Sequence, residues 1–96
     1  TMCKGIARRL RALALYSCDG QVALAALQCE EARTARDATY WLAFAANAIA
    51  DDLSVLAAEM LERESAHPPQ APVLDGLRRR TETLGAIVDE LERTAR

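Results

Sequence analysis

The chain has 96 residues, of which 51% are hydrophobic and 27% are charged, and its formal net charge is −2. This length fits one domain with a small core, so we expect a single domain over residues 1–96. The near-neutral charge argues against a strongly basic nucleic-acid-binding domain. Only four Gly and three Pro occur and β-branched residues are few, so the composition favours helices and leaves little material for a sheet.

Charge and cysteine content indicate the cellular setting. Residues 1–18 carry +4 and residues 19–66 carry −6, a pattern that suggests pairing between segments. Three cysteines without a CxxC spacing, and one histidine, supply neither a disulfide framework nor a zinc site. Because no run of eighteen apolar residues and no signal-peptide pattern occurs, we expect a cytoplasmic protein that does not contact a membrane. The bias to Ala, Arg and Leu suggests a bacterial source.

The first predicted helix runs from about residue 2 to residue 16. Its apolar positions recur at three- and four-residue steps: Cys3, Ile6, Leu10 and Leu13. The turn SCDG follows, in which Asp19 is a candidate N-cap and Gly20 marks the break. The second helix is predicted over about residues 20–34.

The stretch from Gln21 to His67 contains neither Gly nor Pro, so helices two and three could be continuous. One unbroken helix would span roughly 70 Å, too long for a compact monomer of this size. The apolar stripes before and after the middle of the stretch lie more than a quarter-turn apart, and Thr34 and Asp37 between them match a capping box. We therefore predict a third helix over about residues 36–66 and keep the unbroken helix as the alternative.

The fourth predicted helix covers about residues 72–95, after the connection SAHPPQAP. Pro72 suits its first turn, where the missing amide costs nothing. Its predicted core stripe follows a heptad pattern of Leu77, Thr81, Leu84, Val88, Leu91 and Ala95. Val73, Leu74 and Ile87 are predicted to widen this stripe. Arg78 with Glu82, and Asp89 with Arg93, are predicted ion pairs on its outer side.

Four amphipathic helices with short connections predict an all-α fold, an antiparallel four-helix bundle. The third and fourth helices are predicted to be longer than the first two. Part of their surface is therefore left uncovered in a monomer, and a second copy of the chain is the simplest cover. We expect a homodimer.

A metal site is a weaker interpretation of the histidine. His67 follows Glu64 by three residues, a spacing that places both side chains on one helical face in di-iron bundles. Such a site needs a second motif and two further Glu, which only a dimer would supply. The alternative is a helix end loosened by Pro68, since metal sites need rigid support. We expect no metal and no cofactor.

Two pairs of acidic residues suggest an enzymatic alternative. Glu59 with Glu62, and Asp89 with Glu92, could hold Mg²⁺ against a pyrophosphate, and in this the chain resembles the all-α nucleotide pyrophosphohydrolases. The resemblance implies a metal-dependent hydrolase. The double acid expected before the first pair is missing and the second pair is in reverse order. A solvated face with i,i+4 ion pairs is the alternative that we favour.

Nucleic-acid association is the second alternative function. Arginines cluster at residues 8–11 and 78–80, but consecutive arginines point around a helix instead of along one groove-facing line. The clusters have few aromatic neighbours and the chain has a pI near 5.3. Pairing of these arginines with the acidic middle of the chain is the interpretation that we favour.

The segment TYWLAFAANAIADDLSVLA contains the candidate binding residues. Its core face is expected along residues 42–60, and a second apolar face is expected roughly opposite. The predicted partner-binding residues are Trp41, Phe44, Asp51, Asp52 and Val55. The alternative is that the third helix contacts two neighbours inside its own bundle. We expect a non-enzymatic protein–protein interaction module (an adaptor, regulator, chaperone-like binder or inhibitor) that binds itself and another protein.

Overall fold

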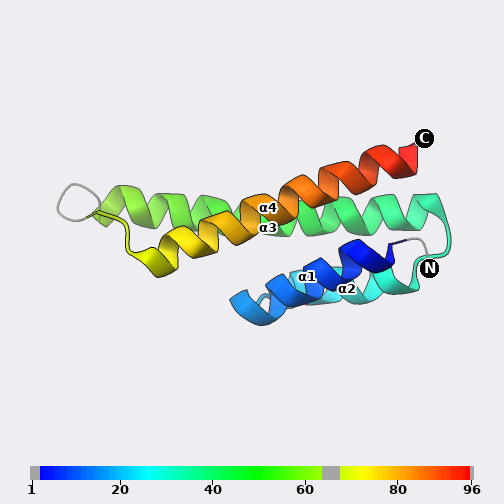
Figure 1. The fold of residues 1–96 in the computed structure, drawn as a ribbon, viewed down its shortest axis with the longest axis horizontal. Helices are drawn as coiled ribbons and strands as arrows, with labels where there is room; N and C mark the ends of the chain where they lie inside the picture. Colours follow the sequence, from blue (N-terminus) through cyan, green and yellow to red (C-terminus); the bar gives the residue numbers. More distant parts are fainter. Residues whose placement is uncertain (1–2, 64–67, 96) are drawn as a thin grey trace.

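The computed structural model describes residues 3–63 and 68–95, and this part of the chain is helical without any strand (Figure 1). The helices are α1 (Lys4–Ser17), α2 (Gly20–Glu31), α3 (Ala35–Arg63) and α4 (Ala71–Ala95). The prediction of an all-α fold is therefore confirmed. Contacts join α1 to α2, α2 to α3, α3 to α4 and α1 to α4.

Local capping groups determine where α2 begins and where the chain breaks before α3. The Asp19 carboxylate accepts hydrogen bonds from the amides of Gln21 at 2.9 Å and Val22 at 3.2 Å, as its N-cap assignment predicts. The Thr34 hydroxyl accepts a hydrogen bond from the Asp37 amide at 3.1 Å. The alternative of one unbroken helix is wrong, and α2 ends three residues earlier than predicted. The predicted end of the third helix, residues 64–66, lies outside the described residues.

The core lies between α1, α2, the first half of α3 and the second half of α4. Its largest fully buried side chains are Cys3, Leu10, Val22, Cys29, Leu42, Ile49 and Ile87. Buried alanines on α2 and α3 lie among them. Because an alanine has only a methyl side chain, these positions allow close approach of neighbouring helices.

The helices differ in length, as the sequence predicts. α1 and α2 have 14 and 12 residues, whereas α3 and α4 have 29 and 25. At 1.5 Å per residue the first pair is about 20 Å long and the second about 40 Å. Figure 1 shows α1 and α2 beneath only one half of the α3–α4 pair, and the other half projects beyond them. We call residues 53–63 and 71–80, the half of the α3–α4 pair that begins beside the α1–α2 turn and extends beyond it, the arm.

The buried side of α4 agrees only in part with the predicted stripe. Ile87 is buried, and Leu84 and Leu91 pack against the core, as predicted. Gly76 and Thr83 are also buried, whereas Thr81 and Val88 of the predicted stripe are exposed, so the buried side is rotated towards Gly76 and Thr83. Ala95 of the same stripe is also exposed. The rotation has a physical cause, because α4 contacts α1 as well as α3 and so turns its buried side towards both.

The ion pairs on α4 also differ from those predicted. Arg79 Nε lies 2.8 Å from Asp75 Oδ2, and Arg93 Nη2 lies 2.7 Å from Glu90 Oε2. The predicted pairs, Arg78 with Glu82 and Asp89 with Arg93, are not formed between these described side chains. Each observed acid lies three or four residues before its arginine, a spacing that suits the helix dipole.

α3 is long and apolar enough to cross a membrane by length and composition alone. Core helices of other proteins meet the same criterion. Five buried residues of α3 contribute to the helical core: Ala38, Leu42, Ala45, Ala48 and Ile49.

Candidate functional site

The aromatic side chains at the start of α3 pack against the core. Trp41 and Phe44 are half-buried, and their rings meet edge-on with centroids 5.3 Å apart. Ala48, which follows Phe44 by about one helical turn, is buried. The prediction that this face lies opposite the core is wrong, because α3 has α2 and α4 as neighbours. The alternative of two neighbours within one chain accounts for these three residues.

The remaining predicted binding residues lie further along α3. Val55 is 59% exposed and Asp51 is exposed, whereas Asp52 is partly buried. Fourteen residues separate Trp41 from Val55, which is about 21 Å along a helix. The structure thus places Trp41 and Val55 far apart along α3.

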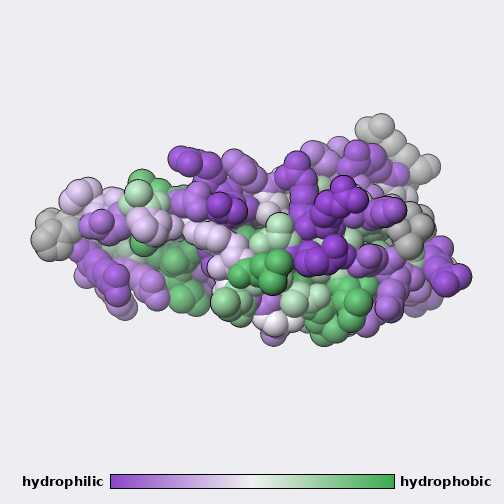
Figure 2. Space-filling model, turned by 60° about the horizontal axis from the view of Figure 1, so that its bottom comes forward, coloured by the Kyte–Doolittle hydropathy of each residue, from purple (hydrophilic) through white to green (hydrophobic). Residues whose placement is uncertain are grey.

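The arm presents apolar side chains that this chain leaves at least partly uncovered. Leu61 and Leu74 are exposed like Val55. Four further apolar residues of the arm are only partly buried: Leu56, Met60, Val73 and Leu77. Leu53 is also partly buried, but it packs against the core. In Figure 2, hydrophobic atoms lie over α1 and α2 and, separately, on the arm. Sequence periodicity indicates that the apolar residues of the arm lie on particular sides of the two helices, but it cannot show that α1 and α2 end beside the start of the arm.

Two acids and an arginine meet where the layer of α1 and α2 ends. Asp19 lies in the turn between α1 and α2, Asp52 on α3 and Arg80 on α4. They line one open pocket of about 390 Å³, together with Val55 and Leu56 of the arm. Arg80 Nε lies 4.0 Å from Asp52 Oδ2. We call Asp19, Asp52 and Arg80 the junction cluster.

The two carboxyl groups of the junction cluster have opposite pKa shifts. Burial, a hydrogen bond with Asp19 and the charge of Asp19 raise the pKa of Asp52 to about 6. Burial also tends to raise the pKa of Asp19, but hydrogen bonds from Asp52 and from the amides of Val22 and Gln21 lower it overall. Asp52 is therefore the carboxyl group that holds a proton more tightly.

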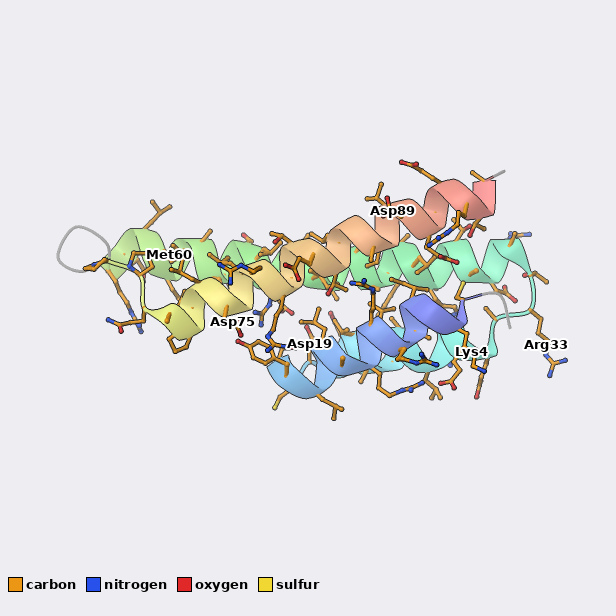
Figure 3. The ribbon with its side chains drawn as sticks, viewed as in Figure 1. Lys4, Asp19, Arg33, Met60, Asp75 and Asp89 are labelled. Carbon is orange, nitrogen blue, oxygen red and sulfur yellow. The ribbon has the colours of Figure 1, made fainter. Side chains whose placement is uncertain are left out.

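A second contact joins the end of α1 to the start of α4. The Arg79 guanidinium lies over the Tyr16 ring, 4.3 Å from its centroid. Arg79 also pairs with Asp75 and, through a hydrogen bond, lowers the pKa of that carboxyl group. Figure 3 places Asp75 and Asp19 close to the end of α1, whereas Met60 lies further towards the tip of the arm.

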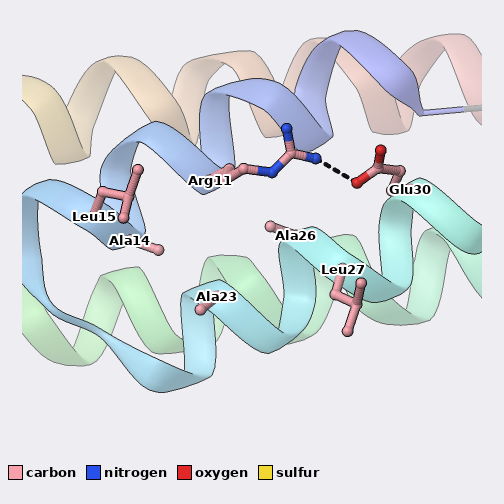
Figure 4. A pocket seen from close by; sticks show the side chains of 7 residues that line it. All are labelled: Arg11, Ala14, Leu15, Ala23, Ala26, Leu27 and Glu30. Atoms are coloured by element: carbon pink, nitrogen blue, oxygen red, sulfur yellow. Dashed lines mark hydrogen bonds and ion pairs between the residues drawn. The ribbon is translucent and has the colours of Figure 1, made fainter.

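A shallow apolar groove of about 170 Å³ runs between α1 and α2 (Figure 4). Ala14, Leu15, Ala26 and Leu27 are among the residues that line it. Arg11 of α1 pairs with Glu30 of α2 at one end of the groove. This ion pair joins the basic first helix to the acidic middle of the chain, as the distribution of charge in the sequence predicts.

The acidic pairs considered for metal binding are not brought together. Glu59 and Glu62 flank Met60 near the tip of the arm, and Figure 3 shows Asp89 near the other end of the α3–α4 pair. Glu92 lies one turn beyond Asp89. Glu64 and His67 are outside the described residues. Within residues 3–63 and 68–95, no group of three or more His, Cys, Asp or Glu is placed to hold a metal ion.

Comparisons with protein-family models, with curated proteins and with solved structures found no match to the chain.

Proposed function

We propose that the protein is a non-enzymatic protein–protein interaction module that acts as a homodimer. We further infer that its four helices form an antiparallel four-helix bundle, which is complete over only half the length of α3 and α4. The arm is the observation that supports both statements. It extends beyond α1 and α2 and leaves apolar side chains of both long helices exposed or half-exposed. Exposed apolar surface of this kind is typical of binding sites.

A second copy fits the arm because the molecule has a stepped shape. α1 and α2 cover about half the length of α3 and α4 on one side. A copy turned by a two-fold axis perpendicular to the helices would place its own arm in the open half. Each arm would then receive the same kind of two-helix cover that α1 and α2 supply elsewhere, and the contact would be isologous.

The proposed interface lies on the side of the arm that faces the junction cluster. Val55 and Leu56 line the open pocket beside the α1–α2 turn and therefore lie on that side. Met60 follows Leu56 by one helical turn, and Val73 precedes the buried Gly76 by nearly one turn. These four apolar side chains form the centre of the proposed interface.

The proposed interface differs from the partner-binding surface that the sequence predicts. Trp41 and Phe44 pack against the core in the covered half of α3, and they are not assigned to the interface. Val55 remains an anchor, and Asp51 and Asp52 border the surface. Such a dimer would act as an adaptor or as a regulator of a larger assembly.

The test is the dissociation constant of the dimer for Val55→Arg and for the matched variant Leu15→Arg. Both side chains are exposed in the single chain, at 59% and 77%, so neither substitution disturbs the core. A charge in the interface costs its desolvation, so Val55→Arg should weaken the dimer at least tenfold, whereas Leu15→Arg on α1 should leave it unchanged. Sedimentation equilibrium over a concentration series measures both. Equal dimer affinity for the two variants would contradict the assignment of the interface to the arm.

A further inference from the structure

One side of α3 continues from the core into the arm. Ile49 is fully buried, and the residues that follow it at steps of three and four positions are Asp52, Leu56, Met60 and Arg63. The first three of these residues are partly buried, and the last is exposed. This side of the arm therefore begins with an acid, continues with two apolar residues and ends with a base.

Asp52 lies at the inner end of the arm, where negative charge is only partly balanced. It lines the open pocket of about 390 Å³ together with Asp19 and Arg80. Arg80 Nε lies 4.0 Å from Asp52 Oδ2, and Arg80 Nη1 donates to the Gly76 carbonyl at 3.0 Å. Two acids thus share one guanidinium that is also bonded to its own helix. The open pocket therefore suits a second guanidinium that comes from outside the chain.

Arg63 lies at the outer end of the arm, where α3 ends furthest from α1 and α2 (Figure 1). It follows Asp52 by eleven residues, which is about 16 Å along a helix. Glu59 precedes Arg63 by one helical turn, and these two described side chains form no ion pair with each other. The exposed guanidinium can therefore pair with an acid of a second copy.

A two-fold axis perpendicular to the helices brings the two ends of this side together. The axis reverses the direction of α3 in the second copy, so the tip of each arm lies beside the inner end of the other. Asp52 then faces Arg63 of the partner subunit, and Arg63 faces Asp52 of the partner subunit. Arms that ran in parallel would place like charges together, which repel. The charges thus favour the same antiparallel arrangement as the stepped shape.

We propose that two reciprocal ion pairs, each between Asp52 of one copy and Arg63 of the other, hold the two arms of the dimer antiparallel and in register. These ion pairs require the proposed dimer, and so rest on the proposed function, but they determine which way its two chains run. Leu56 and Met60 lie between the ion pairs on each helix. Charge pairs at the border of an apolar contact mainly select its orientation and add little to its affinity.

Two charge-reversal variants, mixed at neutral pH, test the pairing. Asp52→Arg carries two arginines at the paired positions and Arg63→Asp carries two aspartates, so each variant repels its own copy. The mixed dimer of the two variants restores both ion pairs. Native mass spectrometry of an equimolar mixture should therefore show the mixed dimer about tenfold more abundant, relative to the two self-dimers, than random pairing gives.

A mixture of Asp89→Arg with Arg63→Asp is the matched control. Asp89 is an exposed aspartate of α4 and lies near the end of the α3–α4 pair that is opposite to the arm (Figure 3). Reversal of its charge supplies no partner for the aspartate at position 63. This mixture should therefore contain the mixed dimer in the proportion that random pairing gives.

A double-mutant cycle with Asp52→Asn and Arg63→Gln provides a second test if Asp52→Arg does not fold. Each single variant should weaken the dimer about fivefold, and the double variant no further, because either change alone already breaks the pair. Random pairing in the first mixture, or purely additive effects in the cycle, would overturn the ion pairs while the wild type is still a dimer. A wild type that stays a monomer would overturn the proposed dimer as well.

Discussion

Two capping side chains determine, at the scale of single residues, how the middle of the chain is divided. Asp19 caps α2 and Thr34 caps the start of α3 through bonds to amides two or three residues away. Such bonds depend only on neighbouring sequence, which is why both caps could be predicted. The junction cluster could not be, because Asp52 lies 33 residues from Asp19 and 28 residues from Arg80 and no local pattern links these positions.

Replacing Thr34 by Ala should lower the free energy of unfolding by about 1 kcal/mol, because the Asp37 amide loses its partner at the start of α3. For a domain of this size that is a fall in the melting temperature of roughly 4–8 °C. Thr39→Ala, at an exposed position within α3, is the control and should not lower the melting temperature, since Ala is the better helix former. Thermal melts at one protein concentration compare the two. An equal effect of both variants would show that Thr34 does not act as a cap.

At the scale of elements, the periodicity of the apolar residues predicts that the helices form. It does not predict which side of each helix is buried. The apolar pattern of α4 predicted a stripe through Thr81 and Val88, yet α4 buries Gly76 and Thr83 instead, because α1 packs beside it. Similarly, Trp41 and Phe44 were predicted on a free face and instead pack against the core. A helical period gives the apolar side of a helix, whereas the neighbours that cover it depend on contacts distant in sequence.

The two interior glycines of α4 should respond differently to replacement by alanine. Nothing lies within 4 Å of a Cβ at Gly85, whereas a Cβ at Gly76 would lie 2.9 Å from Arg80 Nη1. Gly85→Ala should therefore raise the free energy of unfolding by about 0.5–1 kcal/mol through helix propensity. Gly76→Ala should raise the free energy of unfolding by less, because the Arg80 guanidinium must move away from the Gly76 carbonyl. Urea denaturation measures both, and an equal gain would contradict the role given to Gly76.

At the scale of the whole molecule, the stepped outline is the main feature. The described chain extends 49 × 24 × 16 Å, and the arm accounts for much of its length. A two-helix arm has one layer of helices and little core of its own, so its apolar side chains gain cover only from outside the chain. The sequence predicts that α3 and α4 are longer than α1 and α2. It does not predict that the turn between α1 and α2 ends next to Asp52 of α3.

The mass of the wild-type protein in solution tests the central claim most directly. The chain has a mass of 10.5 kDa. Sedimentation equilibrium at micromolar concentrations should give about twice that mass, because the two arms cover each other's apolar side chains. A mass of 10.5 kDa that persists to the highest concentration measured would contradict the account.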